Sequence, residues 1–175
     1  MTKRQSLATQ HDLLYMDLAL ENAETSLKNG WMPVGAIFVH RDRIIASGTK
    51  NGMVHARFDH AEHNGCYQAL WSRKGPRDLD GVTVYSTLEP CILCMAMLLT
   101  TRVSRIVYGL EDPYGGGSYL LSSPKRPARF RKELPELSGG VRRDESMILM
   151  HRFFAAQKEN SKAWPADNPL VMLCR

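Results

Sequence analysis

The order of apolar and polar residues predicts a chain in which helices alternate with short strands. Residues 11–29 carry apolar side chains at helical spacing, namely Leu14, Leu18, Ala19, Ala23 and Leu27. Residues 34–39 predict a strand, and residues 43–47 predict its partner in a hairpin. A polar loop, residues 48–59, then leads to a predicted helix over residues 60–71.

The second half of the chain continues this alternation. A strand is predicted over residues 82–86, a helix over 90–99 and another strand over 105–109. A further short strand is expected to start at Val141, before a helix over residues 146–158. That helix turns Met147, Met150, Phe153 and Phe154 inward. Strands that alternate with helices predict an α/β fold, with helices packed on the faces of a sheet.

The length of 175 residues predicts a single domain, residues 1–175, built around one core. Residues 159–175 are expected to be a C-terminal extension that packs on the body or on a partner. Charged residues make up 23% of the chain, which is ordinary for a soluble globular protein. The net charge of +5 permits a phosphate-bearing partner without requiring one.

Targeting signals and cysteine usage point to a cytoplasmic protein that does not enter the membrane. The sequence contains no run of 18 apolar residues, and residues 1–10 lack the apolar core of a signal peptide. Its four cysteines are too few for a disulfide scaffold at this length. A different role is therefore expected for the cysteines.

Two short motifs at predicted helix starts suggest a metal site. Cys91 and Cys94 are three residues apart, so a helix places them on one face, and Pro90 suits the first helical position. Backbone N–H groups at a helix start favour the thiolates that bind metal. With His60 they supply three protein ligands for one zinc ion per chain and leave a fourth position for water. Glu62 could take a proton from that water.

Three other interpretations use the same residues. Cys91 and Cys94 could form a redox pair, although this leaves His60 and Glu62 without a role. Asp59 and Glu62 have the spacing of a capping box, which would make Glu62 structural. The zinc cluster could also be a staple in a non-catalytic module that binds RNA or a partner protein. The presence of Glu62 argues against the staple, because a purely structural site has no use for a proton shuttle.

Several segments together resemble the zinc-dependent cytidine/deoxycytidylate deaminase superfamily, closest to the branch of tRNA adenosine deaminases and guanine deaminases. The matching segments are Pro33-Val34-Gly35-Ala36, His60-Ala61-Glu62, Thr87-Leu88-Glu89-Pro90-Cys91-Ile92-Leu93-Cys94 and Arg105-Ile106-Val107-Tyr108-Gly109, with looser matches at Arg143-Asp144-Glu145 and Phe153-Phe154. The resemblance implies a three-layer α/β/α sandwich around a five-stranded mixed sheet whose last two strands are parallel. It also implies zinc on His60, Cys91 and Cys94, Glu62 as proton shuttle, and a homodimer.

The reaction implied by the resemblance is hydrolysis of a cyclic amidine C–N bond, which converts an amino group on a nucleobase to an oxo group and releases ammonia. The substrate is expected to be a nucleobase, a nucleoside or tRNA. We expect a purine, either adenosine in tRNA or a free base such as guanine. The alternative is a pyrimidine: cytosine, cytidine or deoxycytidylate.

The loops around these motifs supply the candidate substrate contacts. Asn51 precedes His60 in the approach loop and is expected to bind the base, together with backbone groups of Ala61 and Glu89. Arg57 and Tyr114 are the next candidates. Two segments depart from many relatives: residues 56–59 replace Asp-Pro-Thr-Ala, and residues 113–117 replace a loop that contains lysine in many tRNA enzymes. A basic run over residues 125–132 is a candidate phosphate contact, against the simpler expectation of a solvated loop.

Overall fold

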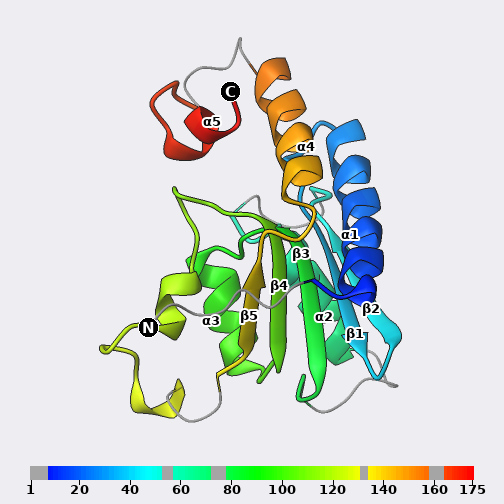
Figure 1. Ribbon diagram of the computed structural model, residues 1–175, viewed down its shortest axis with the longest axis vertical. Coiled ribbons are helices and arrows are strands. Elements are labelled where there is room, and N and C mark those ends of the chain that lie inside the picture. Colours follow the sequence, from blue (N-terminus) through cyan, green and yellow to red (C-terminus); the bar gives the residue numbers. More distant parts are fainter. Residues whose placement is uncertain (1–7, 53–56, 72–77, 131–133, 158–163) are drawn as a thin grey trace.

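The computed structural model describes residues 8–52, 57–71, 78–130, 134–157 and 164–175. Its centre is a five-stranded sheet in the order β2-β1-β3-β4-β5 (Figure 1). The strands are β1 (Gly35–His40), β2 (Arg43–Thr49), β3 (Val82–Leu88), β4 (Arg105–Leu110) and β5 (Glu136–Gly139). β1 pairs antiparallel with β2 and β3, whereas β3–β4 and β4–β5 are parallel pairs. The mixed sheet with two parallel final strands is therefore confirmed.

Helices cover both faces of the sheet, as predicted for a three-layer sandwich. α1 (Gln10–Lys28) and α4 (Arg143–Ala156) lie on one face, and α2 (Ala61–Trp71) and α3 (Ile92–Thr100) on the other (Figure 1). Side chains that alternate along β1 serve the two cores: Phe38 packs on one side, Ile37 and Val39 on the other. Two short 3₁₀ helices, η1 (Ser118–Leu121) and η2 (Ala128–Phe130), follow β4.

The apolar face of α1 differs from the predicted stripe. Leu14 is 54% exposed, whereas Tyr15 and Met16 are buried against the sheet with Ala19 and Ala23. Tyr15 also packs against the ring of Tyr85 and donates a hydrogen bond to the carbonyl oxygen of Asp42. These contacts with β3 and the β1–β2 turn shift the buried face away from Leu14.

The prediction that a strand starts at Val141 is wrong. The last strand, β5, ends at Gly139, and Gly140 has a φ of +88° that breaks the extended backbone. Val141 is buried in the turn that follows, and α4 starts at Arg143, three residues before the predicted position. The β-branched side chain of Val141 is therefore buried in a turn and not in a strand.

The C-terminal residues pack on α4. Trp164 makes edge-to-face contacts with Phe153 and Phe154, and the short helix α5 (Pro169–Leu173) buries Leu170. His151 Nδ1 lies 2.8 Å from the carbonyl oxygen of Cys174, which fixes the end of this segment. Among the described residues, no helix is long and apolar enough to cross a membrane.

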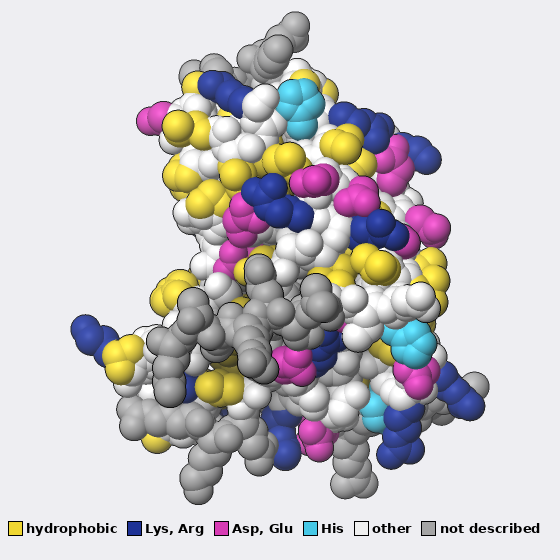
Figure 2. All heavy atoms as spheres, viewed as in Figure 1, with side chains coloured by type: hydrophobic (Ala, Val, Ile, Leu, Met, Phe, Trp, Pro, Cys, Tyr) yellow, Lys and Arg dark blue, Asp and Glu magenta, His cyan; other side chains and the backbone are white. Residues whose placement is uncertain are grey.

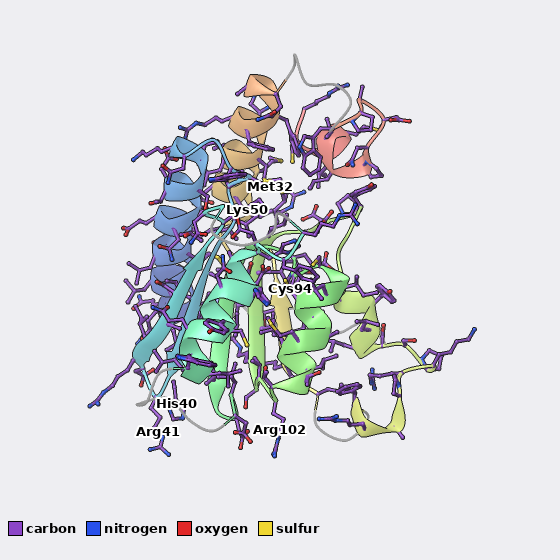
Figure 3. All side chains as sticks on the ribbon, turned by 180° about the vertical axis from the view of Figure 1, so that it is seen from behind. Met32, His40, Arg41, Lys50, Cys94 and Arg102 are labelled. Carbon is purple, nitrogen blue, oxygen red and sulfur yellow. The ribbon has the colours of Figure 1, made fainter. Side chains whose placement is uncertain are left out.

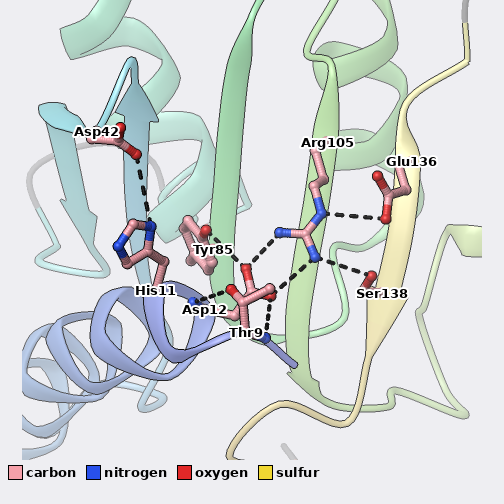
Figure 4. A network of polar contacts seen from close by, with 8 residues as sticks. All are labelled: Thr9, His11, Asp12, Asp42, Tyr85, Arg105, Glu136 and Ser138. Atoms are coloured by element: carbon pink, nitrogen blue, oxygen red, sulfur yellow. Dashed lines mark hydrogen bonds and ion pairs between the residues drawn. The ribbon is translucent and has the colours of Figure 1, made fainter. Parts of the chain in front are cut away.

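A buried polar network ties the start of α1 to the sheet (Figure 4). The carboxylate of Asp12, 1% exposed, accepts hydrogen bonds from Arg105, from the Tyr85 hydroxyl at 3.0 Å and from the Thr9 N–H at 3.0 Å. Burial alone would raise the pKa of Asp12, but the bonds from Arg105 and Thr9 outweigh it and lower that pKa to about 2. The network therefore holds a buried charge with its partners in place.

Candidate active site

The three predicted metal ligands meet at one end of the sheet. His60 directly precedes α2, Cys91 is the N-cap residue of α3, and Cys94 lies in the first turn of α3. His60 Nδ1 is 3.4 Å from Cys91 Sγ and 3.5 Å from Cys94 Sγ, and all three ligand atoms lie within 4.8 Å of one another. One imidazole and two thiols are a donor set that suits zinc and leaves a coordination position for water.

The start of α3 differs slightly from the prediction. Pro90 lies before the N-cap residue rather than at the first helical position, because Cys91 itself has an extended backbone and begins the helix through its carbonyl oxygen. The hydrogen bond from Cys94, together with His60, lowers the pKa of Cys91 to about 4, although burial opposes this. The pKa of Cys94 is raised, because its thiol is hydrogen-bonded to the Cys91 sulfur and is buried. The pair is thus electrostatically coupled.

Glu62 lies beside these ligands in the first turn of α2. Its side chain is 3% exposed, and its Oε1 accepts a hydrogen bond of 3.0 Å from the Ser86 hydroxyl on β3. Burial raises the pKa of Glu62 above its usual range, which suits a carboxyl group that accepts and returns a proton. The orientation of Glu62 is therefore set by the sheet.

The capping-box interpretation of Asp59 is wrong. The Asp59 carboxylate accepts hydrogen bonds from the backbone N–H of Asn51 and Gly52 and from the side-chain amide of Asn64. Desolvation opposes ionisation, yet these bonds lower the pKa of Asp59. Asp59 thus anchors the approach loop to α2, and Glu62 is left to face the site.

A cavity of about 180 Å³ lies against the metal ligands and Glu62. Three of the predicted substrate contacts, Ala61, Glu89 and Tyr114, line it. Asn51 and Arg57 are exposed residues of the approach loop and are not among the residues that line the cavity. The lining residues are Met32, Val34, Lys50, Asp59, His60, Ala61, Glu62, Leu88, Glu89, Cys91, Asp112, Tyr114, Trp164 and Leu170.

Glu89 also organises the loop that follows β4. Its carboxylate accepts hydrogen bonds from the backbone N–H of Asp112 and Ser118, both at 3.1 Å. A Cβ on Gly116 would lie 2.5 Å from the Glu89 carboxyl carbon, so only glycine allows this packing. The Gly117 N–H donates to the Pro90 carbonyl, which joins the loop to the start of α3. The glycine run thus supports the cysteine-bearing turn as well as connecting β4 to η1.

The sequence did not reveal the remaining walls of the cavity. Met32 and Val34 come from the segment between α1 and β1, Lys50 follows β2, and Trp164 and Leu170 come from the C-terminal segment. The apolar run 170–173 indicated burial, but nothing in its spacing indicated which surface it would cover. Lys50 had a weak signal, because it is the neighbour of the predicted base contact Asn51.

Comparison with known proteins identifies the class. The family model for the cytidine and deoxycytidylate deaminase zinc-binding region matches residues 9–110, and the chain belongs to this family. It is therefore a zinc-dependent hydrolytic deaminase, and this membership favours neither the redox interpretation of Cys91 and Cys94 nor the non-catalytic module.

Individual relatives are found among the deaminases. The chain is 33% identical over 153 residues to a tRNA-specific adenosine deaminase of Bacillus subtilis, covering 87% of this chain and 94% of that protein. It resembles a solved structure from a study of tRNA:A34 deaminases, with a TM-score of 0.69 and 30% identity over 78% of this chain and 98% of that one. A Bacillus subtilis guanine deaminase shares the fold, with a TM-score of 0.54 and 23% identity over 70% of this chain and 81% of the other.

Proposed function

We propose that this protein deaminates adenosine in tRNA, so that adenosine and water give inosine and ammonia. The observation that carries the proposal is the cavity that joins the His60, Cys91 and Cys94 cluster to the buried Glu62. The similarity to a tRNA-specific adenosine deaminase over 94% of that protein supports the choice of substrate. A tRNA substrate also agrees with the predicted cytoplasmic location.

The side chains of the site divide the chemistry between them. His60, Cys91 and Cys94 would hold zinc, which lowers the pKa of water so that it becomes a nucleophile near neutral pH. The Glu62 carboxylate would take one proton from the attacking water and deliver it to the ring nitrogen beside the reacting carbon, and would then carry the second proton of that water, from the added hydroxyl, to the leaving amine. Ser86 holds Glu62 in place through its hydroxyl hydrogen bond to Oε1.

The surface limits where a polynucleotide could bind. On the face with α1 and α4, basic and acidic side chains are interspersed (Figure 2). Several of these are paired, including Arg142 with Asp17 and Arg152 with Glu24. In the predicted basic run, Arg126 donates hydrogen bonds to the Leu120 and Leu121 carbonyls, and residues 131–133 lie outside the described residues. Phosphate contacts are therefore expected around the cavity mouth rather than over α1 and α4.

The test is ammonia release from an anticodon stem-loop that carries adenosine, compared with guanine, adenosine and cytidine, at low and high salt. A polynucleotide binds through several phosphate contacts, so its turnover should fall steeply with salt. Glu62→Gln protein is the control for contaminating deaminases. Turnover confined to the stem-loop is the expected result.

A free purine such as guanine is the second candidate. The observation that favours it is the C-terminal wall of the cavity, because Trp164 and Leu170 enclose the space beside the metal ligands. A small base is recognised inside the pocket, so its turnover should barely respond to salt. Salt-insensitive turnover of guanine, with none of the stem-loop, would replace the tRNA proposal.

We also propose that the chain forms a homodimer through the outer face of α2 and α3. Tyr67 and Trp71 are 58% and 75% exposed on α2, and Ile92 is 52% exposed on α3. The rings of Tyr67 and Trp71 stack with their centroids 5.2 Å apart, which presents a flat apolar surface. Sedimentation equilibrium should show a dimer that Trp71→Lys dissociates. Ile148→Lys, on the exposed face of α4, is the matched control and should remain dimeric.

We further propose that residues 1–175 act as one domain. The C-terminal segment supports this, because Leu170 is 1% exposed and lines the same cavity as the metal ligands. Unfolding followed by tryptophan fluorescence and by far-ultraviolet circular dichroism should give coincident transitions. Separate transitions would show that residues 159–175 unfold independently.

A further inference from the structure

Lys50 is held against the active site by contacts at both ends of the residue. It directly follows β2, and its backbone N–H donates to the buried Ser26 hydroxyl at 3.1 Å. Its Nζ donates to the Asp59 carbonyl oxygen at 2.9 Å, directly before the metal ligand His60. The half-buried side chain therefore forms part of the cavity wall beside the metal ligand His60.

The position of Lys50 separates it from the other basic residues at turns. Met32 and Lys50 lie at the end of the sheet near Cys94, whereas His40, Arg41 and Arg102 lie at the opposite end (Figure 3). Among the described residues that line the cavity, four carry carboxyl groups: Asp59, Glu62, Glu89 and Asp112. Lys50 contributes an ammonium group to the same lining. Four acidic groups disfavour a phosphate inside this cavity, so the ammonium suits a neutral acceptor.

The chemistry of the base limits which of its atoms can accept a hydrogen bond from Lys50. An ammonium group donates hydrogen bonds and accepts none. Adenine presents its amino group as a donor, and its acceptors are ring nitrogens. The ring nitrogen beside the reacting carbon receives its proton from Glu62, which leaves N3 and N7. Either of these atoms could accept a bond from Lys50 without disturbing the proton path.

We propose that Lys50 is a specificity-determining residue that donates a hydrogen bond to N3 or N7 of the bound purine. This inference rests on the proposed purine deaminase function. It also assigns to Lys50 part of the role that the sequence suggested for its neighbour Asn51, whose backbone N–H is bound by Asp59 and which does not line the cavity.

The first measurement compares Lys50→Met and Lys50→Arg with wild-type protein on the anticodon stem-loop. Lys50→Met should lower kcat/KM roughly 10- to 100-fold, the range for loss of a hydrogen bond from a charged donor. Zinc content should stay at one per chain, and Lys50→Arg should recover part of the loss. Lys28→Met removes a lysine from the exposed end of α1 and is the matched control. A change below twofold for Lys50→Met would overturn the proposal.

The salt dependence separates a base contact from a phosphate contact. If Lys50 binds the base, the slope of log kcat/KM against log salt should be unchanged in Lys50→Met. If it binds a phosphate, the slope should shrink by about 1, and the proposal fails. Loss of zinc from Lys50→Met would also overturn it, because Lys50 would then act by holding the approach loop at Asp59.

Substrate analogues identify the contacted atom. Stem-loops with 3-deazaadenosine or 7-deazaadenosine at the target position lack N3 or N7. On one of them, wild-type and Lys50→Met proteins should have nearly equal kcat/KM, because the acceptor is already absent. An undiminished effect of Lys50→Met on both analogues would show that Lys50 does not contact the ring.

The wild-type activity panel keeps this test distinct from that of the proposed function. If wild-type protein deaminates guanine instead of the stem-loop, the tRNA assignment fails. The Lys50 comparison is then made on guanine and 7-deazaguanine only, because N3 of guanine adjoins its reacting carbon and receives the proton from Glu62; a Lys50→Met effect that persists undiminished on 7-deazaguanine would overturn the proposal. Turnover of a pyrimidine alone would overturn both proposals.

Discussion

The two ends of the sheet both bury acidic side chains, and they stabilise them differently. At the start of α1, Asp12 is 1% exposed, and hydrogen bonds from Arg105 and Tyr85 keep it ionised. At the other end, Glu62 is 3% exposed, with a hydrogen bond from the neutral Ser86 hydroxyl. Hydrogen bonds lower the pKa of Asp12 to about 2, whereas burial raises the pKa of Glu62.

This difference shows how one fold separates stability from chemistry. A buried carboxylate with an arginine partner stays charged and contributes to stability throughout the physiological range. A buried carboxyl without such a partner is ready to exchange a proton, which is what a general acid–base catalyst requires. Substitutions at the Glu62 end should therefore reduce activity most, and substitutions at the Asp12 end should reduce stability most.

The largest effect is expected from removal of a metal ligand. Cys94→Ala leaves two of the three ligands, so purified protein should lose most of its zinc, its activity and much of its stability. Metal analysis, with Cys66→Ala as control, checks this, because Cys66 is a buried cysteine outside the cluster. Unchanged zinc in Cys94→Ala would show that the ligand assignment is wrong.

Glu62→Gln should leave zinc and fold intact and reduce turnover about 10²- to 10⁴-fold, the range for loss of a general acid–base group. Glutamine keeps the size of the side chain and can still accept a hydrogen bond from Ser86, but it cannot carry the proton. Steady-state kinetics and zinc analysis on the same preparation test this. An active Glu62→Gln enzyme would exclude Glu62 as the proton shuttle.

Asp12→Asn should reverse this pattern, with zinc and kcat/KM preserved and the free energy of unfolding lowered. The cost is about 3 kcal/mol at pH 7, because Arg105 loses its buried partner. The folded-state pKa of about 2 lies below the usual aspartate pKa of 3.8, so the stabilisation is full above about pH 4. It is lost as the pH falls through 2. Urea unfolding of both proteins should therefore give curves that converge between pH 4 and 2. A constant difference would contradict the assignment.

Local spacing was sufficient to predict the four residues that the structure brings together at the candidate site. His60, Glu62, Cys91 and Cys94 lie at the starts of two helices, and the alternation of strands and helices fixes which ends of the sheet those starts occupy. The layers of the sandwich followed from the same alternation. These features depend on neighbouring residues in the sequence, so periodicity and motif spacing were enough to reveal them.

Features that depend on distant segments could not be predicted in this way. Asp59 has the spacing of a helix cap, but the approach loop offers its own N–H groups and captures the carboxylate. Trp164 reaches the cavity because Phe153 and Phe154 on α4 provide its packing surface. The competition between local and distant partners is decided by tertiary packing, which no local pattern records.

The smallest effect sharpens the comparison between the two ends of the sheet. Ser86→Ala removes the hydroxyl that orients Glu62, and Ser138→Ala removes a hydroxyl 3.4 Å from the Arg105 guanidinium. A single neutral hydrogen bond contributes about 1 kcal/mol, so Ser86→Ala should lower kcat/KM roughly 3- to 10-fold with zinc retained. Ser138→Ala should leave kcat/KM unchanged, because Arg105 keeps its bonds to Asp12. Parallel kinetics on the two variants measure the difference. If Ser138→Ala lowered activity as much as Ser86→Ala, the loss would reflect general loosening of the sheet rather than the orientation of Glu62.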